Sequence, residues 1–334
     1  VANTQHSDDF VQLFVDRLEE RRVLSVTAAL TDGVLTVTSD GESDNVTIRL
    51  FNAGEDGSGA TTEMIEVLDN GAVIDIDILG FGPAAPQSQI ATSMILNRDG
   101  NAAALNVDLG GGDDVLDLQI PTGASFSNGV TLDVTVLDGA GDDTVHLIDN
   151  GAVSGAPNAT NVSLNVTAEH IQFGMGDSDF RLDTADLDLH GTLELTTDQT
   201  LTTDGDVTLD GNIVGAGFDF TLDLTDSNID SEVNEFVVDG MLGHSMNRLG
   251  DISVTASHVS VGSLFAGSLA TDLDDSTGSF ATTAGDLDLT NSLDAEGSFS
   301  LNGNLEANSL NLTGATEFNA VGMNRGFNLG TING

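Results

Sequence analysis

The chain has 334 residues and a formal net charge of −46, because 54 Asp and Glu residues face only 8 basic residues, all of them arginine. A surface this acidic repels nucleic acid and anionic membranes, so we expect no nucleic-acid partner and no membrane insertion. The absence of Cys and Lys excludes disulfides, thiolate metal sites, lysine isopeptide links and Schiff-base chemistry. The absence of Trp and Tyr argues against aromatic platforms that grip sugars or bases.

Residues 1–25 carry the one helical pattern of the sequence. Phe10, Phe14 and Leu18 recur every four positions within residues 10–24. This spacing predicts a short amphipathic helix. The helix would either cover the open end of a β stack or serve as a targeting or docking segment.

Residues 26–100 have the pattern of a β-rich N-terminal region. Apolar and polar residues alternate in three runs, as is typical of strands with one buried face, and turn dipeptides such as Asp32-Gly33 separate the runs. The runs are residues 34–38, 46–50 and 73–78. A soft boundary to the next region is expected near residues 97–101.

Residues 101–334 continue the alternation with irregularly spaced Gly-Asp or Gly-Asn turns, and we predict that they form a parallel β-solenoid. The whole chain is therefore expected to be all-β apart from the N-terminal helix. The alternative is a set of antiparallel β-sandwich domains, which Asn-Gly hairpin dipeptides favour locally. These dipeptides begin at Asn70, Asn128, Asn150 and Asn302.

Two acidic glycine turns, residues 110–116 and 139–145, each connect one strand-like run to the next. They start 29 positions apart, so they would stack directly if one coil of the solenoid has that length. Four carboxylates would then converge across a ladder spacing of about 4.8 Å and repel one another unless a cation lies between them. Calcium is the expected ion because it takes six to eight oxygens in irregular geometry. The predicted ligands are Asp113, Asp114, Asp142 and Asp143.

The two turns resemble the calcium-binding repeat of haemolysin-type proteins, in which glycines and an aspartate alternate along a β-roll. The resemblance implies that Asp114 and Asp143 supply side-chain ligands and that Gly112 and Gly141 supply backbone carbonyls. That family repeats every nine residues in long arrays, whereas this chain has two good copies, with residues 39–46 as a decayed third. The alternative interpretation is a pair of turns that bind no ion.

The N-terminal half also resembles large exported surface proteins of the planctomycete type. Residues 17–25 are similar to their Leu-Glu-x-Arg-x-Leu leader element, residues 30–37 are similar to the strand pair that follows it, and acidic glycine turns come next. The resemblance implies export and a place at the cell surface or outside the cell. It implies no catalytic activity.

No catalytic motif is evident in the sequence. The six histidines have no metal-ligand spacing, and Arg181, Arg248 and Arg325 are isolated basic residues that we interpret as surface charge partners. We therefore expect no enzymatic activity.

The expected function is that of an extracellular or cell-surface structural protein. We expect a subunit of a surface layer, fibre or adhesive filament that calcium stabilises and that assembles non-covalently, head to tail, into a homopolymer. Two alternatives remain: a β-helix that binds or cleaves extracellular polysaccharide, and an acidic surface protein of a salt-loving organism.

Overall fold

The computed structural model describes residues 25–55, 61–79, 87–91, 103–120, 132–149, 162–173, 179–182, 186–203, 205–224, 234–273, 278–283, 286–320 and 327–333. These residues form 26 strands of one mostly parallel sheet, so the prediction of an all-β chain is confirmed. The helix predicted over residues 10–24 lies outside the described residues. The described part of the chain contains no helix that could cross a membrane.

The N-terminal strands include all the antiparallel pairs between strands of the described chain. A hairpin joins β1 (Thr27–Thr31) to β2 (Val34–Thr38) through Asp32 and Gly33, whose φ angles are 51° and 86°. Both residues of a tight hairpin turn need positive φ, which Asp tolerates and Gly adopts freely. The other antiparallel pairs join β3 (Asn45–Glu55) to β4 (Thr61–Asp69), and β4 to β5 (Ala72–Val73) and β7 (Ile90–Ala91). A short parallel strand, β6 (Ile76–Leu79), pairs with β1.

From β8 onward every described pairing between strands is parallel, and the strands form three columns. The first column begins with β2 and runs through the first parts of β12, β14, β19 and β21 and the last parts of β24 and β25. Its members are β8 (Ala103–Asp108), β10 (Leu132–Leu137), β12 (Val162–Phe173), β14 (Leu187–Glu194), β16 (Val207–Asp210), β19 (Glu235–Leu242), β21 (His258–Leu273), β22 (Ser279–Thr282), β24 (Ser292–Leu301) and β25 (Leu305–Ala320).

The second column begins with β3, and it also uses the later parts of β12, β14 and β19, the middle of β21 and the start of β25. The strands that belong to it alone are β9 (Val115–Ile120), β11 (Thr144–Asp149), β17 (Ile213–Val214) and β23 (Leu287–Leu289), and it ends at β26 (Phe327–Asn333).

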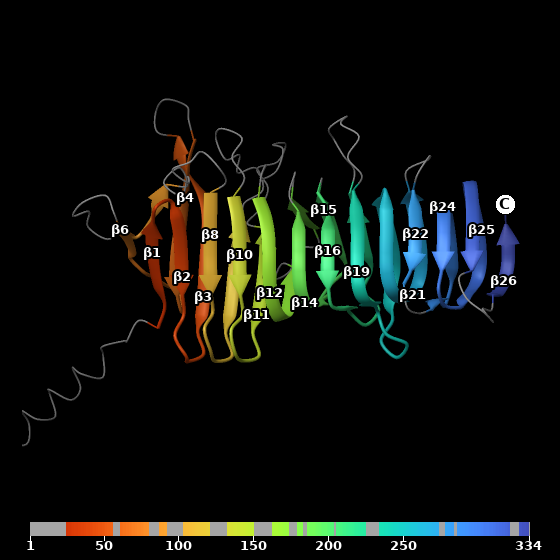
Figure 1. Cartoon of the computed structure of the whole chain (residues 1–334), viewed down its shortest axis with the longest axis horizontal. Coiled ribbons are helices and arrows are strands. Elements are labelled where there is room, and N and C mark those ends of the chain that lie inside the picture. The colour runs from red at the N-terminus through yellow and green to blue at the C-terminus, as the bar shows by residue number, and fades with distance from the viewer. Residues whose placement is uncertain are drawn as a thin grey trace, which may run out of the picture.

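The third column adds β13 (Asp179–Leu182), β15 (Gln199–Thr203), β18 (Phe220–Asp223) and β20 (Leu249–Ala256), and continues through β21, β24, β25 and β26. From β8 onward the strands stand side by side along the long axis of the molecule in chain order, with β26 at the C-terminal end, whereas β6 lies beside β1 at the other end (Figure 1). Because β2 pairs with β8 and β3 with β9, the sheet is continuous across the boundary predicted near residue 100.

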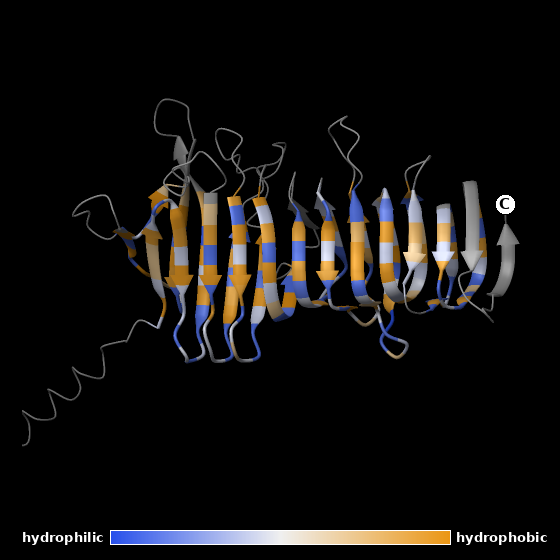
Figure 2. Cartoon of the chain, viewed as in Figure 1, coloured by the Kyte–Doolittle hydropathy of each residue, from blue (hydrophilic) through white to orange (hydrophobic). Residues whose placement is uncertain are grey.

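One ladder of buried apolar residues follows the first column. Orange and blue alternate along the strands, so each strand presents its apolar side chains to one face (Figure 2). The residues at one register position of this column are all buried, and the rings of Phe280 and Phe299 stack with centroids 5.1 Å apart. Burying each such side chain contributes about 1.5–3 kcal/mol. The ladder consists of Leu105, Val134, Leu164, Leu187, Val207, Phe236, Val259, Phe280 and Phe299.

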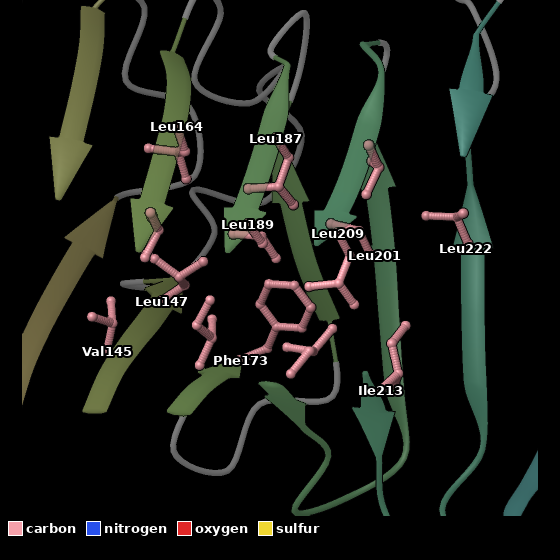
Figure 3. Close-up of a cluster of buried hydrophobic side chains, with 14 of the residues drawn as sticks. Val145, Leu147, Leu164, Phe173, Leu187, Leu189, Leu201, Leu209, Ile213 and Leu222 are labelled. Carbon is pink, nitrogen blue, oxygen red and sulfur yellow. The ribbon is translucent and has the colours of Figure 1, made fainter. Parts of the chain in front are cut away.

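Side chains from the different columns meet in a shared interior. Leu187 and Leu189 of the first column, Ile213 of the second and Leu201 of the third belong to one cluster around Phe173 (Figure 3). Antiparallel sandwiches therefore do not describe the strands that the structure places between residues 103 and 333. The predicted parallel arrangement of the strands is confirmed for that part of the chain.

Candidate cation site at the acidic turns

The two predicted turns lie at the corner where the chain passes from the first column to the second, and they stack directly on one another. Gly111 forms a parallel bridge with Ala140, and the N–H of Thr144 donates to the carbonyl oxygen of Asp114 over 2.9 Å. The offset is 29 positions, as the sequence predicts.

A third turn, residues 39–44, lies on the N-terminal side of the other two. The N–H of Gly111 donates to the carbonyl of Asp40 over 3.0 Å, and the N–H of Val115 donates to the carbonyl of Asp44 over 2.9 Å. The sequence that resembles a decayed third copy of the motif therefore stacks with the two good copies.

Glycine is required in these turns because their backbones approach one another closely. Gly112 has φ +110°, a conformation that L side chains rarely adopt, and an added Cβ at Gly141 would overlap the carbonyl oxygen of Gly112. The N–H of Gly112 donates to the carbonyl of Ala140 over 2.9 Å. The two glycines thus form part of the backbone contact between stacked turns.

Asp44, Asp114 and Asp143 form a buried column on the inner side of the corner. The N–H of Asp44 donates to Oδ1 of Asp114 over 2.6 Å, and the N–H of Asp114 donates to Oδ1 of Asp143 over 2.8 Å. The N–H of Asp143 donates to Oε2 of Glu169 over 3.0 Å. The carboxylates of Asp114, Asp143 and Glu169 therefore each accept a hydrogen bond from the backbone of the preceding turn.

The three carboxylates of this column differ in whether both of their oxygens accept a hydrogen bond. Both oxygens of the Asp44 carboxylate have a hydrogen-bond donor, because the hydroxyls of Ser25 and Ser39 donate to them. Asp114 and Asp143 are both fully buried, and Oδ2 of each has no hydrogen-bond partner within the described residues. Burying a polar atom with no partner costs about 1–3 kcal/mol of folding free energy, and more when the atom is charged. A proton or a cation bound at these two atoms would therefore stabilise the fold.

Burial raises the pKa of Asp114 from 3.8 to about 6; the hydrogen bond from Asp44 opposes the rise and the charge of Asp143 adds to it. Burial also raises the pKa of Asp143, with the bond from Asp114 acting against it and the charge of Glu169 adding to it. Both carboxylates are thus destabilised in their charged form, which either a proton or a cation relieves.

Asp113 and Asp142 form a separate, exposed column on the same turns. The N–H of Asp113 donates to Oγ of Ser43 over 2.9 Å, and the N–H of Asp142 donates to Oδ1 of Asp113 over 3.1 Å. His170 Nε2 lies 2.9 Å from Asp142 Oδ1. The four predicted carboxylates are therefore divided into a buried pair and an exposed pair.

His170 connects the exposed column to the next strand of the second column. Its Nδ1 lies 2.7 Å from Oε1 of Glu194, and this hydrogen bond is the main reason that its pKa is raised above 6.5, with Asp142 adding to the effect. His146 on β11 lies 2.7 Å from Asp117 on β9, between the two strands that precede β12 in the same column. Two of the histidines that look scattered in the sequence thus pair with carboxylates of neighbouring strands.

Carboxylates also accept backbone N–H groups at the other corners of the stack. At one corner the N–H of Asp206 donates to Asp186 over 3.2 Å, and the N–H of Glu235 donates to Asp206 over 2.9 Å. At another, the N–H of Asp219 donates to Asp198 over 3.0 Å and the N–H of Asp251 to Asp219 over 2.7 Å. Acidic side chains therefore supply hydrogen-bond acceptors for backbone N–H groups at the corners, where strand pairing is interrupted.

Calcium fits the buried pair in part. Parallel strands are about 4.8 Å apart, close to twice a calcium–oxygen distance of about 2.4 Å, so a cation between Oδ2 of Asp114 and Oδ2 of Asp143 would contact both. Calcium takes six to eight oxygens, so backbone carbonyls or water would supply the others. In the described part of the chain no three His, Asp or Glu side chains gather where they could hold a metal together.

Asp44, Ser25 and Glu169 complete the site and were not predicted. Asp44 could be found from residues 39–46, because its place in that copy of the motif matches Asp114 and Asp143. Glu169 lies within β12, which turns the corner with Ala168 and Glu169 and without a Gly-Asp turn, so no motif marks it.

No protein-family model, no curated protein and no solved structure matches this chain. The fold and the stacked acidic turns are therefore the basis for the function proposed below.

Proposed function

We propose that this chain is an extracellular structural protein, a rigid β-solenoid rod that serves as a subunit of a surface layer, fibre or adhesive filament. The observation that carries the proposal is the parallel register, which continues from β8 to β26 with one ladder of buried side chains. Each turn of such a solenoid adds one strand to each column, so its length scales with the number of turns. An elongated rod suits a spacer or building block.

The described polar side chains support a structural rather than a catalytic role, because many of them connect one turn of the chain to the next. Carboxylates accept backbone N–H groups at the corners, and histidines pair with carboxylates across strands. Arg248 donates to Oδ2 and to the carbonyl of Asp288 over 2.6 and 2.7 Å and lies over the ring of Phe265, so it acts as a charge partner within the protein.

Calcium is the proposed stabilising ion, held at Oδ2 of Asp114 and Oδ2 of Asp143. The support is that these atoms are buried and unpartnered in the described structure, on two turns that a hydrogen bond from Asp114 to Asp143 joins. Calcium sites of extracellular modules bind in the range of about 0.1–1 mM, which suits a site with few protein ligands. An extracellular location is proposed on this ground and on the two sequence resemblances.

Assembly is proposed to be non-covalent and head to tail. The two ends of the described rod are unlike, because among the described strands antiparallel pairs join only members of β1–β7, whereas β25 and β26 remain in parallel register. Contact between unlike ends does not close on itself and propagates as a filament. The helix predicted within residues 1–25 is the proposed contact, and a net charge of −46 makes assembly depend on salt or divalent cations.

The test uses electron microscopy and sedimentation of the full chain and of residues 25–334, which keep Ser25 as a donor to Asp44, each in calcium with added salt. The proposal predicts filaments from the full chain and folded monomeric rods from the truncated chain. Filaments of equal length from both would remove the helix from the contact. A full chain that stays monomeric would overturn the filament and leave a tethered surface rod.

A further inference from the structure

A pocket of about 470 Å³ opens on the outer face of the second column, between the end of β14, strand β17 and the turn that follows β19. It is separate from the acidic turns. Its lining mixes carboxylate, amide, hydroxyl and imidazole groups with aliphatic side chains. The polar members are Glu194, Thr196, Asn212, His244 and Asn247.

The wall of the pocket is a closed turn anchored to the sheet. The N–H of Gly243, which has φ +72°, donates to the carbonyl of Ile213 over 2.8 Å, and His244 and Asn247 exchange backbone hydrogen bonds of 3.1 and 2.9 Å. The N–H of Met246 donates to Nδ1 of His244 over 3.2 Å. The wall is therefore formed before any ligand binds, which limits the entropy lost on binding.

The polar groups of the pocket are oriented by their neighbours. The carboxylate of Glu194 lies 2.7 Å from Nδ1 of His170 and accepts a 3.0 Å bond from Gln172, which fixes its plane. Because Nδ1 of His244 accepts a hydrogen bond, its ring proton is on Nε2, where it can donate. Asn212 accepts the N–H of Met241 over 2.8 Å through Oδ1, so its amide nitrogen carries the donors that remain.

The charge of the pocket selects the ligand. No arginine lines it, and the chain carries a net charge of −46, so an anion would be repelled. A cation would meet one carboxylate, which His170 already partners. The partly exposed aliphatic side chains of Val214 and Met241 offer an apolar surface beside the polar groups. The ligand chemistry that fits is neutral and rich in hydroxyls, with C–H faces between them.

We infer that this pocket binds a neutral oligosaccharide, with Asn212, Asn247, Thr196 and His244 as donors and Glu194 as acceptor. Its volume falls within the range of small-ligand pockets and accommodates a short oligosaccharide segment. The rod would then contact a neutral glycan along its side, independently of calcium at the acidic turns and of end-to-end assembly. Without aromatic stacking the expected affinity is weak, with a Kd of about 1 mM.

Saturation-transfer NMR on the full chain tests the inference, with cellotetraose, mannotetraose and triacetylchitotriose as neutral probes and tetragalacturonate as the acidic comparator. We expect saturable binding of at least one neutral probe. Asn247→Ala should weaken that binding about tenfold, the usual effect of one lost hydrogen bond to a ligand. Ala216→Trp should abolish it by filling the pocket.

Ser245→Ala is the matched control, because Ser245 is exposed in the same turn and does not line the pocket. It should bind as the unchanged protein does. The inference is overturned if no neutral probe binds at about 10 mM, if tetragalacturonate binds better than every neutral probe, or if Ala216→Trp leaves binding intact. Circular dichroism confirms that each variant is folded, and an unfolded Ala216→Trp is replaced by Ala216→Phe.

Discussion

The backbone N–H of Asp114 donates a 2.8 Å hydrogen bond to Oδ1 of Asp143, while Oδ2 of both residues is buried without a partner in the described structure. The bond fixes the two carboxylates in successive turns, one strand spacing apart. A cation or a proton at their free oxygens would relieve the cost of burying two carboxylates close together.

The double substitution Asp114→Asn with Asp143→Asn should abolish the effect of calcium on stability. Asn keeps the Oδ1 acceptor for the backbone and removes the charge that would hold the ion. For the unchanged protein, calcium at about 100 times its Kd should raise the free energy of unfolding by about 2.7 kcal/mol relative to chelator. Thermal unfolding in both conditions measures the difference.

The matched control is Asp113→Asn with Asp142→Asn, on the exposed column of the same turns. It should retain the calcium effect, because these side chains lie outside the buried pair. If this control lost the stabilisation by calcium and the Asp114→Asn, Asp143→Asn variant kept it, the calcium site would lie at Asp113 and Asp142 instead. Equal stabilisation by sodium chloride and calcium chloride at matched ionic strength would favour a protein adapted to salt.

In chelator, the stability of the protein should rise as the pH falls. The folded state raises the pKa of Asp114 from 3.8 to about 6, so folding favours the protonated acid. Its stabilising effect is present in full below pH 3.8 and is lost as the pH rises through 6. Relative to Asp114→Asn, the unchanged protein should be less stable by about 3 kcal/mol at pH 7, and the gap should close toward pH 4.

Denaturant unfolding of both proteins across this pH range measures that gap. The pKa of His170 is also raised, so its contribution to stability is present in full below pH 6.5 and is lost as the pH rises further; it is present in both proteins and cancels in the comparison. A gap that does not change between pH 4 and pH 7 would show that burial does not perturb Asp114.

Gly141→Ala should destabilise the protein by about 3 kcal/mol, because its Cβ would overlap the carbonyl oxygen of Gly112 in the turn beneath. Gly111→Ala is the matched control. Its Cβ would lie 3.5 Å from the carbonyl of Ala140, an ordinary contact, and position 140 of the next turn already carries alanine. Equal unfolding midpoints for the two variants would mean that the turns do not stack as described.

Arg248→Ala should reduce stability by about 1–2 kcal/mol and should change no activity. The side chain pairs with Asp288 at partly buried positions and covers Phe265, so its loss removes a charged hydrogen bond and packing. Turnover assays on neutral and acidic polysaccharides should show no reaction by the unchanged protein. Turnover that disappears in Arg248→Ala would instead support a polysaccharide lyase.

The strands, and the turns that connect them, could be predicted from the sequence where neighbouring residues alone determine the backbone conformation. Asp32-Gly33 and Asn70-Gly71 adopt positive φ and make antiparallel turns, as such dipeptides favour. The same dipeptide at Asn302-Gly303 joins β24 to β25, which pair in parallel, so no hairpin forms there. The N–H of Asn302 donates to Thr282 in the strand stacked beneath, a contact that only the complete stack provides.

The candidate site could be predicted as far as the spacing of 29 positions allows. That spacing identifies which turns stack, but it does not reveal that Asp114 faces the core while Asp113 faces solvent. The partners of the column depend on register with distant strands, as for Glu169 in β12 and Ser25 before β1. The pocket beside His244 has no sequence motif, because its walls come from three separate strands and a turn.

A crystal structure of the full chain grown in calcium, with an anomalous difference map, tests the central claim most directly. The account predicts three columns of parallel strands and a calcium peak about 2.3–2.6 Å from Oδ2 of both Asp114 and Asp143. A map with no peak there at saturating calcium, and with the two oxygens bonded to protons or water, would contradict it.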